Sequence, residues 1–423
     1  MLYPNGILKN IYRWRWVKMK IINGGITAPI GFVAAGVHCG LKKNVKKKDL
    51  AVIYSNKICT AAGVYTTNKV KGAPLIVTME HLENLKAQAV IVNSGNANTC
   101  TGLVGYENAK KMASLTAESL NIKAEDVIVA STGVIGAHLN MAFLEKGIPE
   151  VCLAISKQGY IDAREAIKTT DTVKKDLGIE IDIAGKKVTI GAMAKGSGMI
   201  HPNMATMLAF ITTDLDIDET LLAEALKESV SKTYNMISVD GDTSTNDMTV
   251  ILANGMAENT KITEKDINYK IFLDALQFLN TELAKKIAKD GEGATKLLET
   301  LVKGASTYEE GAKVAKAIIA SSLVKTAMFG ADANWGRILC AIGYCGEDIN
   351  PESVSISFES GKGYIKVYEN SQPLDFSEEK AKEILLENEI QIIVELNKGN
   401  FEAVAWGCDL SYEYVRINGD YRS

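Results

Sequence analysis

Histidine is scarce in this chain of 423 residues, and its cysteines form no recognisable pair. The four histidines lack the spacing of metal ligands, and the seven cysteines include no Cys-x-x-Cys, so neither a metal site nor a dithiol redox centre is expected. An odd, dispersed set of cysteines is typical of reduced and mostly buried thiols, which predicts a cytoplasmic protein. The cysteines are Cys39, Cys59, Cys100, Cys152, Cys340, Cys345 and Cys408.

The chain also lacks an excess of charge of one sign and a long apolar run. It has 47 lysines and arginines against 51 aspartates and glutamates, so its charge does not predict nucleic acid or a membrane surface as a partner. No apolar run approaches the roughly 20 residues that cross a bilayer. Hydrophobic residues make up 47% and charged residues 23%, which is typical of a globular protein with room for two or more cores.

The first residues differ from the rest of the chain. Residues 1–20 contain five basic residues and two tryptophans but no acidic residue and no continuous apolar segment of the kind a targeting peptide needs. We interpret residues 1–18 as an extension that is disordered or not native, with Met19 as the natural start. An arm that lies on a membrane surface is the alternative.

From residue 26 onward, β-rich runs bounded by Gly, Pro and Asn alternate with segments of helical periodicity. Asp218 and a Thr263-x-x-Asp266 pattern are the helix-start signals. No repeat or linker separates the two halves, so we predict one mixed α/β (α+β type) protein. The helices are expected at 81–85, 107–120, 141–153, 160–167, 218–234, 263–289, 308–322 and 376–387. The strands are expected at 51–55, 62–66, 74–77, 89–92, 126–130, 180–183, 187–190, 207–213, 248–254, 354–359, 363–368, 391–396 and 413–417.

The most informative segment is 195–210, which reads KGSGMIHPNMATMLAF. Thr206 follows the small residue Ala205, between a Gly-rich turn and an apolar run, and the preceding Gly and Pro can hold the backbone bent. If the Thr206 hydroxyl attacks the Ala205 carbonyl, an ester forms that water can split. The new Thr206 then carries a hydroxyl nucleophile and an α-amine whose unperturbed pKa of ~7.7–8.0 suits a general base. A buried strand entered through a Gly/Pro turn is the plainer alternative.

Such a cut would divide the chain into 19–205 and 206–423. Both halves are predicted to be mixed α/β, so we expect two intertwined fragments that share a core.

Four further positions suit acyl transfer at Thr206. Thr132 and Gly133 can supply a hydroxyl and a backbone N–H to a developing oxyanion, although the same residues would make an ordinary turn after a strand. Lys195 can neutralise a carboxylate, and Glu292 can pair with a substrate ammonium, although each could also be a solvated surface residue. The acidic segment 240–247 lacks the Gly at the sixth place and the Glu at the twelfth place of a calcium loop, where Thr245 and Ile251 stand, so we interpret it as a polar turn before a strand.

The central segment resembles the self-cleavage signature of the ornithine acetyltransferase family of arginine biosynthesis. The similarity begins near Gly24 and extends over nearly the whole remaining chain, while residues 1–18 have no counterpart and Arg422 replaces what is more often a small polar residue. The other matching segments are 24–29 (GGITAP), 93–98 (NSGNAN), 131–136 (STGVIG), 169–172 (TTDT), 290–296 (DGEGATK), 330–337 (GADANWGR) and 418–423 (NGDYRS).

The resemblance implies layered sheets flanked by helices and a ping-pong reaction on Thr206, in which acetyl passes from N2-acetylornithine to glutamate without a cofactor. It implies that Thr132 and Gly133 form the oxyanion hole. It also implies two copies of each fragment in a heterotetramer, and in some members the use of acetyl-CoA as a second donor. The substrate-binding positions it implies are Thr169, Lys195, Thr206, Glu292, Asn418 and Ser423.

Two other functions stay open from the residues alone. One is an N-terminal-nucleophile amidase or aminopeptidase, in which water takes the acyl group; a polar amino-acid pocket around Lys195 and Glu292 argues against it. The other is a non-catalytic binding protein, which would need no cleavage at Thr206 and would run as one uncut chain on a denaturing gel.

Overall fold

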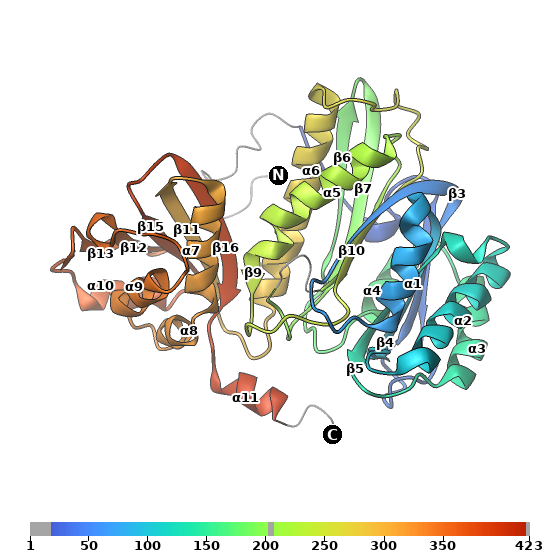
Figure 1. Cartoon of the computed structure of the whole chain (residues 1–423), viewed down its shortest axis with the longest axis horizontal. Coiled ribbons are helices and arrows are strands. Elements are labelled where there is room, and N and C mark those ends of the chain that lie inside the picture. Colours follow the sequence, from blue (N-terminus) through green and yellow to red (C-terminus); the bar gives the residue numbers. More distant parts are fainter. Residues whose placement is uncertain (1–17, 202–206, 420–423) are drawn as a thin grey trace.

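The computed structural model describes residues 18–201 and 207–419. Residues 1–17 of the predicted extension, the predicted cleavage pair Ala205 and Thr206, and the predicted substrate contact Ser423 lie outside the described residues. Within them the structure is mixed α/β, with two sheets and helices on their faces (Figure 1). This confirms the predicted fold class.

The strands are β1 (Lys20–Ile22), β2 (Phe32–Val37), β3 (Leu50–Tyr65), β4 (Lys86–Asn96), β5 (Val127–Val134), β6 (Asp176–Ile183), β7 (Lys186–Lys195), β8 (Leu208–Thr213), β9 (Ile237–Ser238), β10 (Met248–Ala253), β11 (Leu297–Ala305), β12 (Ser355–Ser360), β13 (Gly363–Glu369), β14 (Gln372–Pro373), β15 (Glu389–Glu395) and β16 (Phe401–Cys408). The α-helices are α1 (Ala73–His81), α2 (Gly102–Leu120), α3 (Met141–Leu153), α4 (Tyr160–Ala166), α5 (Glu219–Lys232), α6 (Ile267–Lys289), α7 (Tyr308–Ala320), α8 (Ser322–Phe329), α9 (Trp335–Gly343), α10 (Glu378–Leu385) and α11 (Tyr412–Asn418). Short 3₁₀ helices lie at Gly25–Thr27, Leu82–Asn84, Ala124–Asp126, Tyr234–Met236 and Pro351–Ser353. Among the described helices, none combines the length and the apolar character that crossing a membrane requires.

The larger sheet has nine strands in the order β1-β6-β7-β8-β10-β3-β4-β5, with β2 also paired to β3. Strand β3 is irregular between Tyr54 and Cys59, and its two parts differ in their partners. The first part pairs with β2 and β4, whereas the second pairs with β10 and only at its beginning with β4. A single buried cluster contains Phe210 and Val250 from one part of the sheet and Val90 from the other. The sheet therefore folds over onto itself at β3.

Helices cover both outer faces of this folded sheet, which gives four layers. Val77 of α1 and Met112 of α2 pack with Ile91 of β4 in one outer cluster. Leu222 of α5 and Phe272 of α6 belong to the cluster on the other side. Because neighbouring residues of a strand point to opposite faces, β4 contributes alternately to the inner and outer layers.

Strands from both sides of the expected cleavage position alternate in the larger sheet. β8 and β10, which follow residue 206, lie between β7 and β3, which precede it. β7 pairs with β8 in antiparallel register, with Lys195 opposite Leu208, and β8 runs parallel to β10. The two predicted fragments therefore interdigitate within one sheet.

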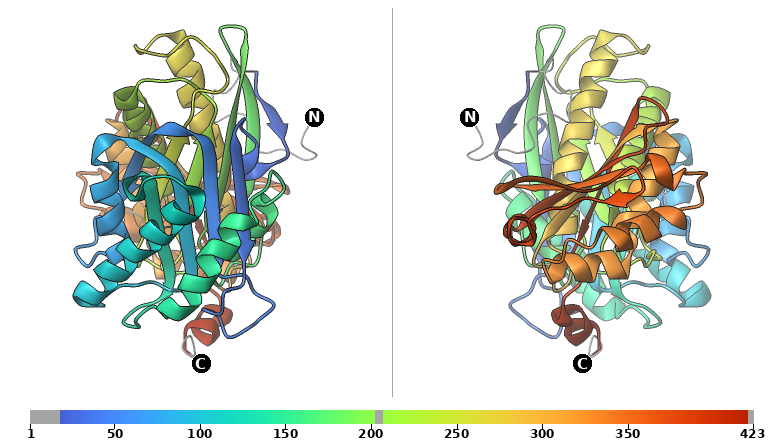
Figure 2. Two further views of the ribbon diagram at one scale, coloured as in Figure 1. Left: turned by 90° about the vertical axis from the view of Figure 1, so that its right-hand side faces the viewer. Right: turned by 90° about the vertical axis from the view of Figure 1, so that its left-hand side faces the viewer.

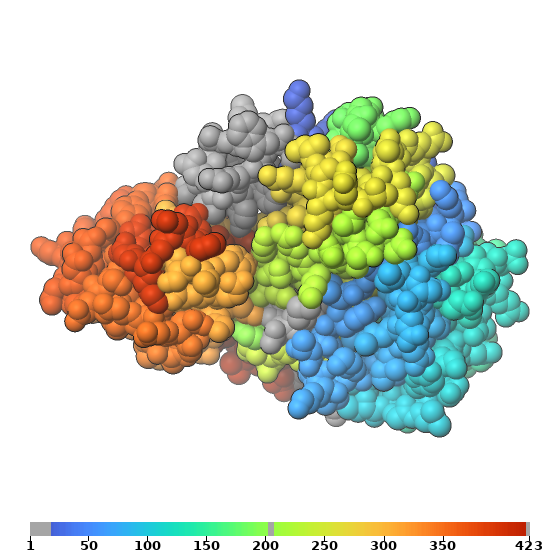
Figure 3. Space-filling model, turned by 45° about the horizontal axis from the view of Figure 1, so that its top comes forward, coloured from blue at the N-terminus to red at the C-terminus, as the bar shows by residue number. Residues whose placement is uncertain are grey.

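The smaller sheet has seven strands in the order β14-β13-β12-β15-β11-β16-β9. On β16, Ala403 lies against Gly311 of α7, whereas the Trp406 ring lies 5.5 Å from Lys285 Nζ of α6. Because these two residues of β16 point to opposite faces, the sheet lies between α7 and α6, and α6 separates it from the larger sheet (Figure 2). Figure 3 shows the orange part of the chain, which includes most of the smaller sheet, at one end of the molecule and the blue to cyan part at the other.

Two expected strands are helices. Residues 74–77 belong to α1, because Pro74 occupies the first turn of a helix, where its missing N–H costs nothing. Residues 413–417 belong to α11, whose N-cap Ser411 accepts a hydrogen bond from the Glu413 N–H. Both segments have strand-like composition, but their caps and tertiary contacts outweigh it.

The helix-start signals were partly right. Asp218 caps α5 as predicted, accepting hydrogen bonds from the N–H groups of Thr220 and Leu221. Helix α6 begins at Ile267 instead of 263, and its N-cap is Asp266, which accepts a hydrogen bond from the Tyr269 N–H at 2.9 Å.

Candidate active site

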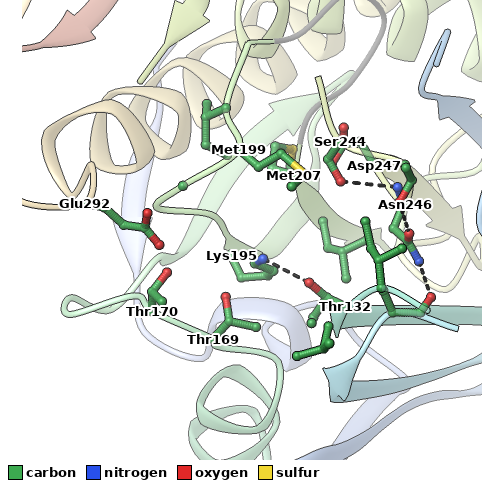
Figure 4. Close-up of a pocket in the computed structure, with 18 of the residues that line it drawn as sticks. Thr132, Thr169, Thr170, Lys195, Met199, Met207, Ser244, Asn246, Asp247 and Glu292 are labelled. Carbon is green, nitrogen blue, oxygen red and sulfur yellow. Dashed lines mark hydrogen bonds between the residues drawn. The ribbon is translucent and has the colours of Figure 1, made fainter. Parts of the chain in front are cut away.

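A cavity of about 360 Å³ opens where the end of β5, the end of β7 and the starts of β8 and β10 meet (Figure 4). Its wall also includes residues 169–170, Glu292 and the end of α11. The lining residues are Ala97, Thr132, Gly133, Val134, Ile135, Thr169, Thr170, Lys195, Gly198, Met199, Ile200, Met207, Leu208, Ser244, Thr245, Asn246, Asp247, Glu292 and Asn418.

The cavity brings together every predicted site residue that the structure describes. Thr132 and Gly133 come from β5, Lys195 from β7, and Asn418 from α11. The remaining two, Thr169 and Glu292, come from loops. Thr206 and Ala205 lie outside the described residues, but Met207, which directly follows Thr206, lines the cavity. Residues more than 280 positions apart in sequence therefore share one wall.

Gly133 occupies a position that only glycine can fill. Its φ is 132°, which side-chain-bearing residues rarely adopt. A Cβ at this position would lie 2.3 Å from the carbonyl carbon of Gly95 and 2.5 Å from the Asn96 nitrogen. The absence of a side chain keeps the backbone of β5 close to β4 and leaves its end open to the cavity.

Lys195 is the last residue of β7 and is buried, at 9% exposed. Its Nζ donates a hydrogen bond to Thr132 Oγ1 at 3.1 Å, so the predicted oxyanion donor and the predicted carboxylate partner are in direct contact. Burial lowers the pKa of Lys195, while the nearby carboxylates of Asp171 and Asp247 act in the opposite direction. A buried ammonium of this kind favours an anionic ligand.

Asp171 stabilises the charge of Lys195 and the backbone that follows it. It accepts hydrogen bonds from the Gly196 N–H and from Lys175 Nζ, both at 2.7 Å. Burial alone would raise the pKa of Asp171, but the charges of Lys175 and Lys195 lower it to about 2. Lys175 also pairs with Asp290. Sequence reasoning quoted Asp171 within the TTDT match but assigned it no role.

Glu292 lies on the side of the cavity away from Asp247 (Figure 4). Its Oε2 accepts a hydrogen bond from Asn418 Nδ2 at 2.8 Å, which joins two predicted substrate-binding positions. The Glu292 N–H donates to the Ser197 carbonyl at 3.0 Å, so the Gly-rich turn fixes its backbone. Gly198 lies against the carboxylate itself, since a Cβ there would be 2.2 Å from Oε2.

The acidic segment 240–247, interpreted as a polar turn, also contributes to the cavity. The Asn246 amide donates to the carbonyls of Ala97 at 2.6 Å and Ser131 at 3.0 Å, and its oxygen accepts from the hydroxyls of Thr99 and Thr245. Three of these hydrogen bonds, to Ala97, Thr99 and Ser131, fix the segment to β5 and to the residues that follow β4. Within residues 18–201 and 207–419, no cluster of acidic, His and Cys side chains could hold a metal.

The ArgJ family model matches residues 33–423 of this chain. A protein of Caldanaerobacter subterraneus subsp. tengcongensis named arginine biosynthesis bifunctional protein ArgJ is 53% identical over 405 residues, which cover 96% of this chain and 100% of that protein. A protein of Clostridium acetobutylicum named arginine biosynthesis bifunctional protein ArgJ 1 is 52% identical over 406 residues. The match covers 96% of this chain and 99% of that protein. The crystal structure of the argJ protein of Bacillus halodurans is 51% identical, covers 51% of this chain and 99% of that chain, and has a TM-score of 0.48.

The cavity and the family match together define an enzyme of acyl transfer. The chain belongs to the ArgJ family of arginine biosynthesis. This confirms the family resemblance stated from the sequence.

Proposed function

We propose that this chain transfers an acetyl group from N2-acetylornithine to glutamate through an acetyl ester of Thr206, in the cyclic route to arginine. The observation that carries the proposal is the cavity itself. It places Thr132 and Gly133, Lys195 and Glu292 around the start of β8, where Thr206 directly precedes Met207.

Self-cleavage between Ala205 and Thr206 would supply the nucleophile. The break would fall between β7 and β8, which are paired in the sheet, so the strands on either side stay in place. The α-amine released at Thr206 then serves as the general base for the Thr206 hydroxyl.

The polar groups of the cavity match an acetylated amino acid. Lys195 binds the α-carboxylate, and Glu292 binds the side-chain ammonium of ornithine. Thr169, Asn418 and Ser423 complete the substrate contacts. The acetyl carbonyl oxygen lies toward Thr132 and Gly133, which stabilise its negative charge in the transition state.

The reaction proceeds in two halves and needs no cofactor, because the acetyl group is passed on. In the first half Thr206 takes the acetyl group and ornithine leaves; in the second the glutamate amine attacks the ester. The relatives are named bifunctional, which supports acetyl-CoA as a second donor.

We further propose that the fragments 19–205 and 206–423 stay associated, that two copies of each form a heterotetramer, and that the enzyme works in the cytoplasm. The interdigitated sheet supports the first point. All seven cysteines are free, which supports a reducing compartment.

Intact mass spectrometry of the purified protein, before and after addition of N2-acetylornithine, tests this function. We expect two fragments, the second of which gains one acetyl group that glutamate then removes. Thr206→Ala should stay uncut and inactive, whereas Thr206→Ser keeps a hydroxyl and should be cut. Release of free acetate without transfer to glutamate would instead indicate the amidase. An active protein that is a single uncut chain would refute the mechanism.

A further inference from the structure

Asp247 is a buried carboxyl in the wall of the cavity to which no role has been given. It directly precedes β10 and is 4% exposed. Its backbone carbonyl accepts a hydrogen bond from the Thr66 N–H at 3.0 Å, but its side-chain Oδ2 has no hydrogen-bond partner among the described residues. Buried polar atoms are normally paired, so an unpaired one in a cavity wall indicates a ligand or a proton as its partner.

The surroundings of Asp247 favour its neutral form. Burial raises the pKa of Asp247 well above the ordinary value of 3.8, although hydrogen bonds from Ser244 and the charge of Lys195 act in the opposite direction. Lys195 on β7 is the charged group that acts on it among the residues described; Thr132 of β5 and Met207 before β8, which also line the cavity, are neutral. A carboxyl with a raised pKa can donate a proton.

The position of Asp247 is fixed relative to the reacting groups. Its neighbour Asn246 is tied by its amide to the carbonyl of Ser131, next to Thr132. On the other side, the Met248 N–H donates to the Met207 carbonyl at 2.9 Å. The Asp247 backbone is therefore anchored both to the predicted oxyanion pair and to the strand that follows Thr206.

Each half of the proposed reaction requires a proton transfer beyond the one between the Thr206 hydroxyl and its α-amine. When an amide becomes an ester and the released amine leaves as an ammonium ion, one proton is consumed beyond the one that the hydroxyl supplies. When the ammonium of glutamate becomes an amide, one proton is released beyond the one that returns to the hydroxyl. The site must supply a proton in the first half and accept one in the second.

We propose that Asp247 is a catalytic residue that carries this proton, an inference that rests on the proposed function. In the first half the carbon–nitrogen bond of N2-acetylornithine breaks, the ester bond to Thr206 forms, and the Asp247 carboxyl gives its proton to the departing nitrogen. In the second half the Asp247 carboxylate takes a proton from the glutamate ammonium, the free amine attacks the ester, and the Thr206 hydroxyl is restored. The carboxyl ends the cycle in its original form.

Glu292 is the other carboxyl among the described lining residues, and it is less suited to this task. Its Oε2 already accepts a hydrogen bond from Asn418, and it lies across the cavity from Asp247, with Lys195 between them in the view of Figure 4. If Lys195 holds the α-carboxylate, the α-nitrogen attached to the same carbon also lies near Lys195. Asp247 and Lys195 line the same cavity, so this carboxyl shares that region.

Two acetyl donors that differ in their leaving group test the proposal. N2-acetylornithine must release an amine that needs a proton, whereas p-nitrophenyl acetate releases a phenolate that needs none. In Asp247→Asn we expect the rate of acetyl-enzyme formation to fall roughly 10²-fold or more with the first donor and to change less than about threefold with the second. The matched control is Asp242→Asn, an exposed carboxyl of the same segment, which should change neither rate.

An equal loss with both donors would assign Asp247 a structural role and overturn the proposal, as would an unchanged rate with N2-acetylornithine. If Asp247→Asn does not fold, the wild-type enzyme still decides the question. Acetylation by N2-acetylornithine should then decline at alkaline pH where acetylation by p-nitrophenyl acetate does not, and parallel profiles would overturn the proposal. Failure of the wild type to form any acetyl-enzyme would instead count against the proposed function.

Discussion

Gly198→Ala should weaken binding of the ornithine side chain without disturbing the fold. Gly198 does not have a positive φ, so alanine fits its backbone. The new Cβ would lie 2.2 Å from Glu292 Oε2 and 2.4 Å from its Cδ. To reach an ordinary contact of 3.4 Å, Oε2 must move by about 1.2 Å, which breaks its 2.8 Å hydrogen bond from Asn418. The displaced atoms are the end of a flexible side chain, so the change is local.

The expected loss follows from the interaction that the displaced carboxylate makes. A hydrogen bond to a charged group contributes about 1.5–3 kcal/mol, so kcat/KM for N2-acetylornithine should fall by about one to two powers of ten. Discharge of the acetyl-enzyme to glutamate should fall less, because glutamate brings no cationic side chain.

Stopped-flow or quenched-flow measurement of the two half-reactions checks this prediction. Gly343→Ala is a suitable control, since it lies in α9 with no atom within 4 Å of the added Cβ. Equal losses in both half-reactions, or no loss in the first, would show that Glu292 does not bind the ornithine side chain, and the cavity would have to be assigned differently.

Two further predictions concern the support of the cavity. Gly133→Ala forces a Cβ to within 2.3 Å of the Gly95 backbone. Because this displaces an oxyanion donor, we expect kcat to fall by ~10²–10³. A normal kcat in a variant with an unchanged circular dichroism spectrum would contradict that role. Asp171 has a pKa of about 2, below its ordinary 3.8, so its charge stabilises the fold above pH ~4 and this stabilisation is lost as the pH falls toward 2. Asp171→Asn should lower the melting temperature at pH 7 and flatten its decline between pH 4 and 2, and an unchanged decline in thermal-melt scans would count against this account.

Local signals in the sequence predicted much of the fold. The Asp218 cap and the strands predicted at 180–183 and 187–190 depend only on nearby residues, and the structure has the cap and the strands β6 and β7 there. The strands predicted at 74–77 and 413–417 were wrong. The composition of these segments favours strands, but their caps and partners favour helices. Strands β11 and β16 were missed, although they pair with each other inside the smaller sheet.

The candidate site divides in a similar way. Lys195 and Thr132 were chosen for their chemistry, and the structure places them in contact. Asp247 was passed over because its segment resembles an ordinary turn. Asp247 is buried because β8 pairs with β10, which joins residues about forty positions apart. The residues next to Asp247 in the sequence do not predict this burial. Roles for buried carboxyls of this kind depend on tertiary structure.

The alternation of strands across residue 206 has a consequence for how the protein must be made. Without β8 and β10, the strands before residue 206 would separate into a β1-β6-β7 group and a β2-β3-β4-β5 group, and β7 and β3 would become open edges. The later fragment alone would expose both sides of its β8–β10 pair. Open edges of this kind recruit other strands and lead to aggregation. If the chain is cut at Thr206 as proposed, folding must precede the cut, and fragments produced from separate genes should precipitate unless each meets its complement during synthesis.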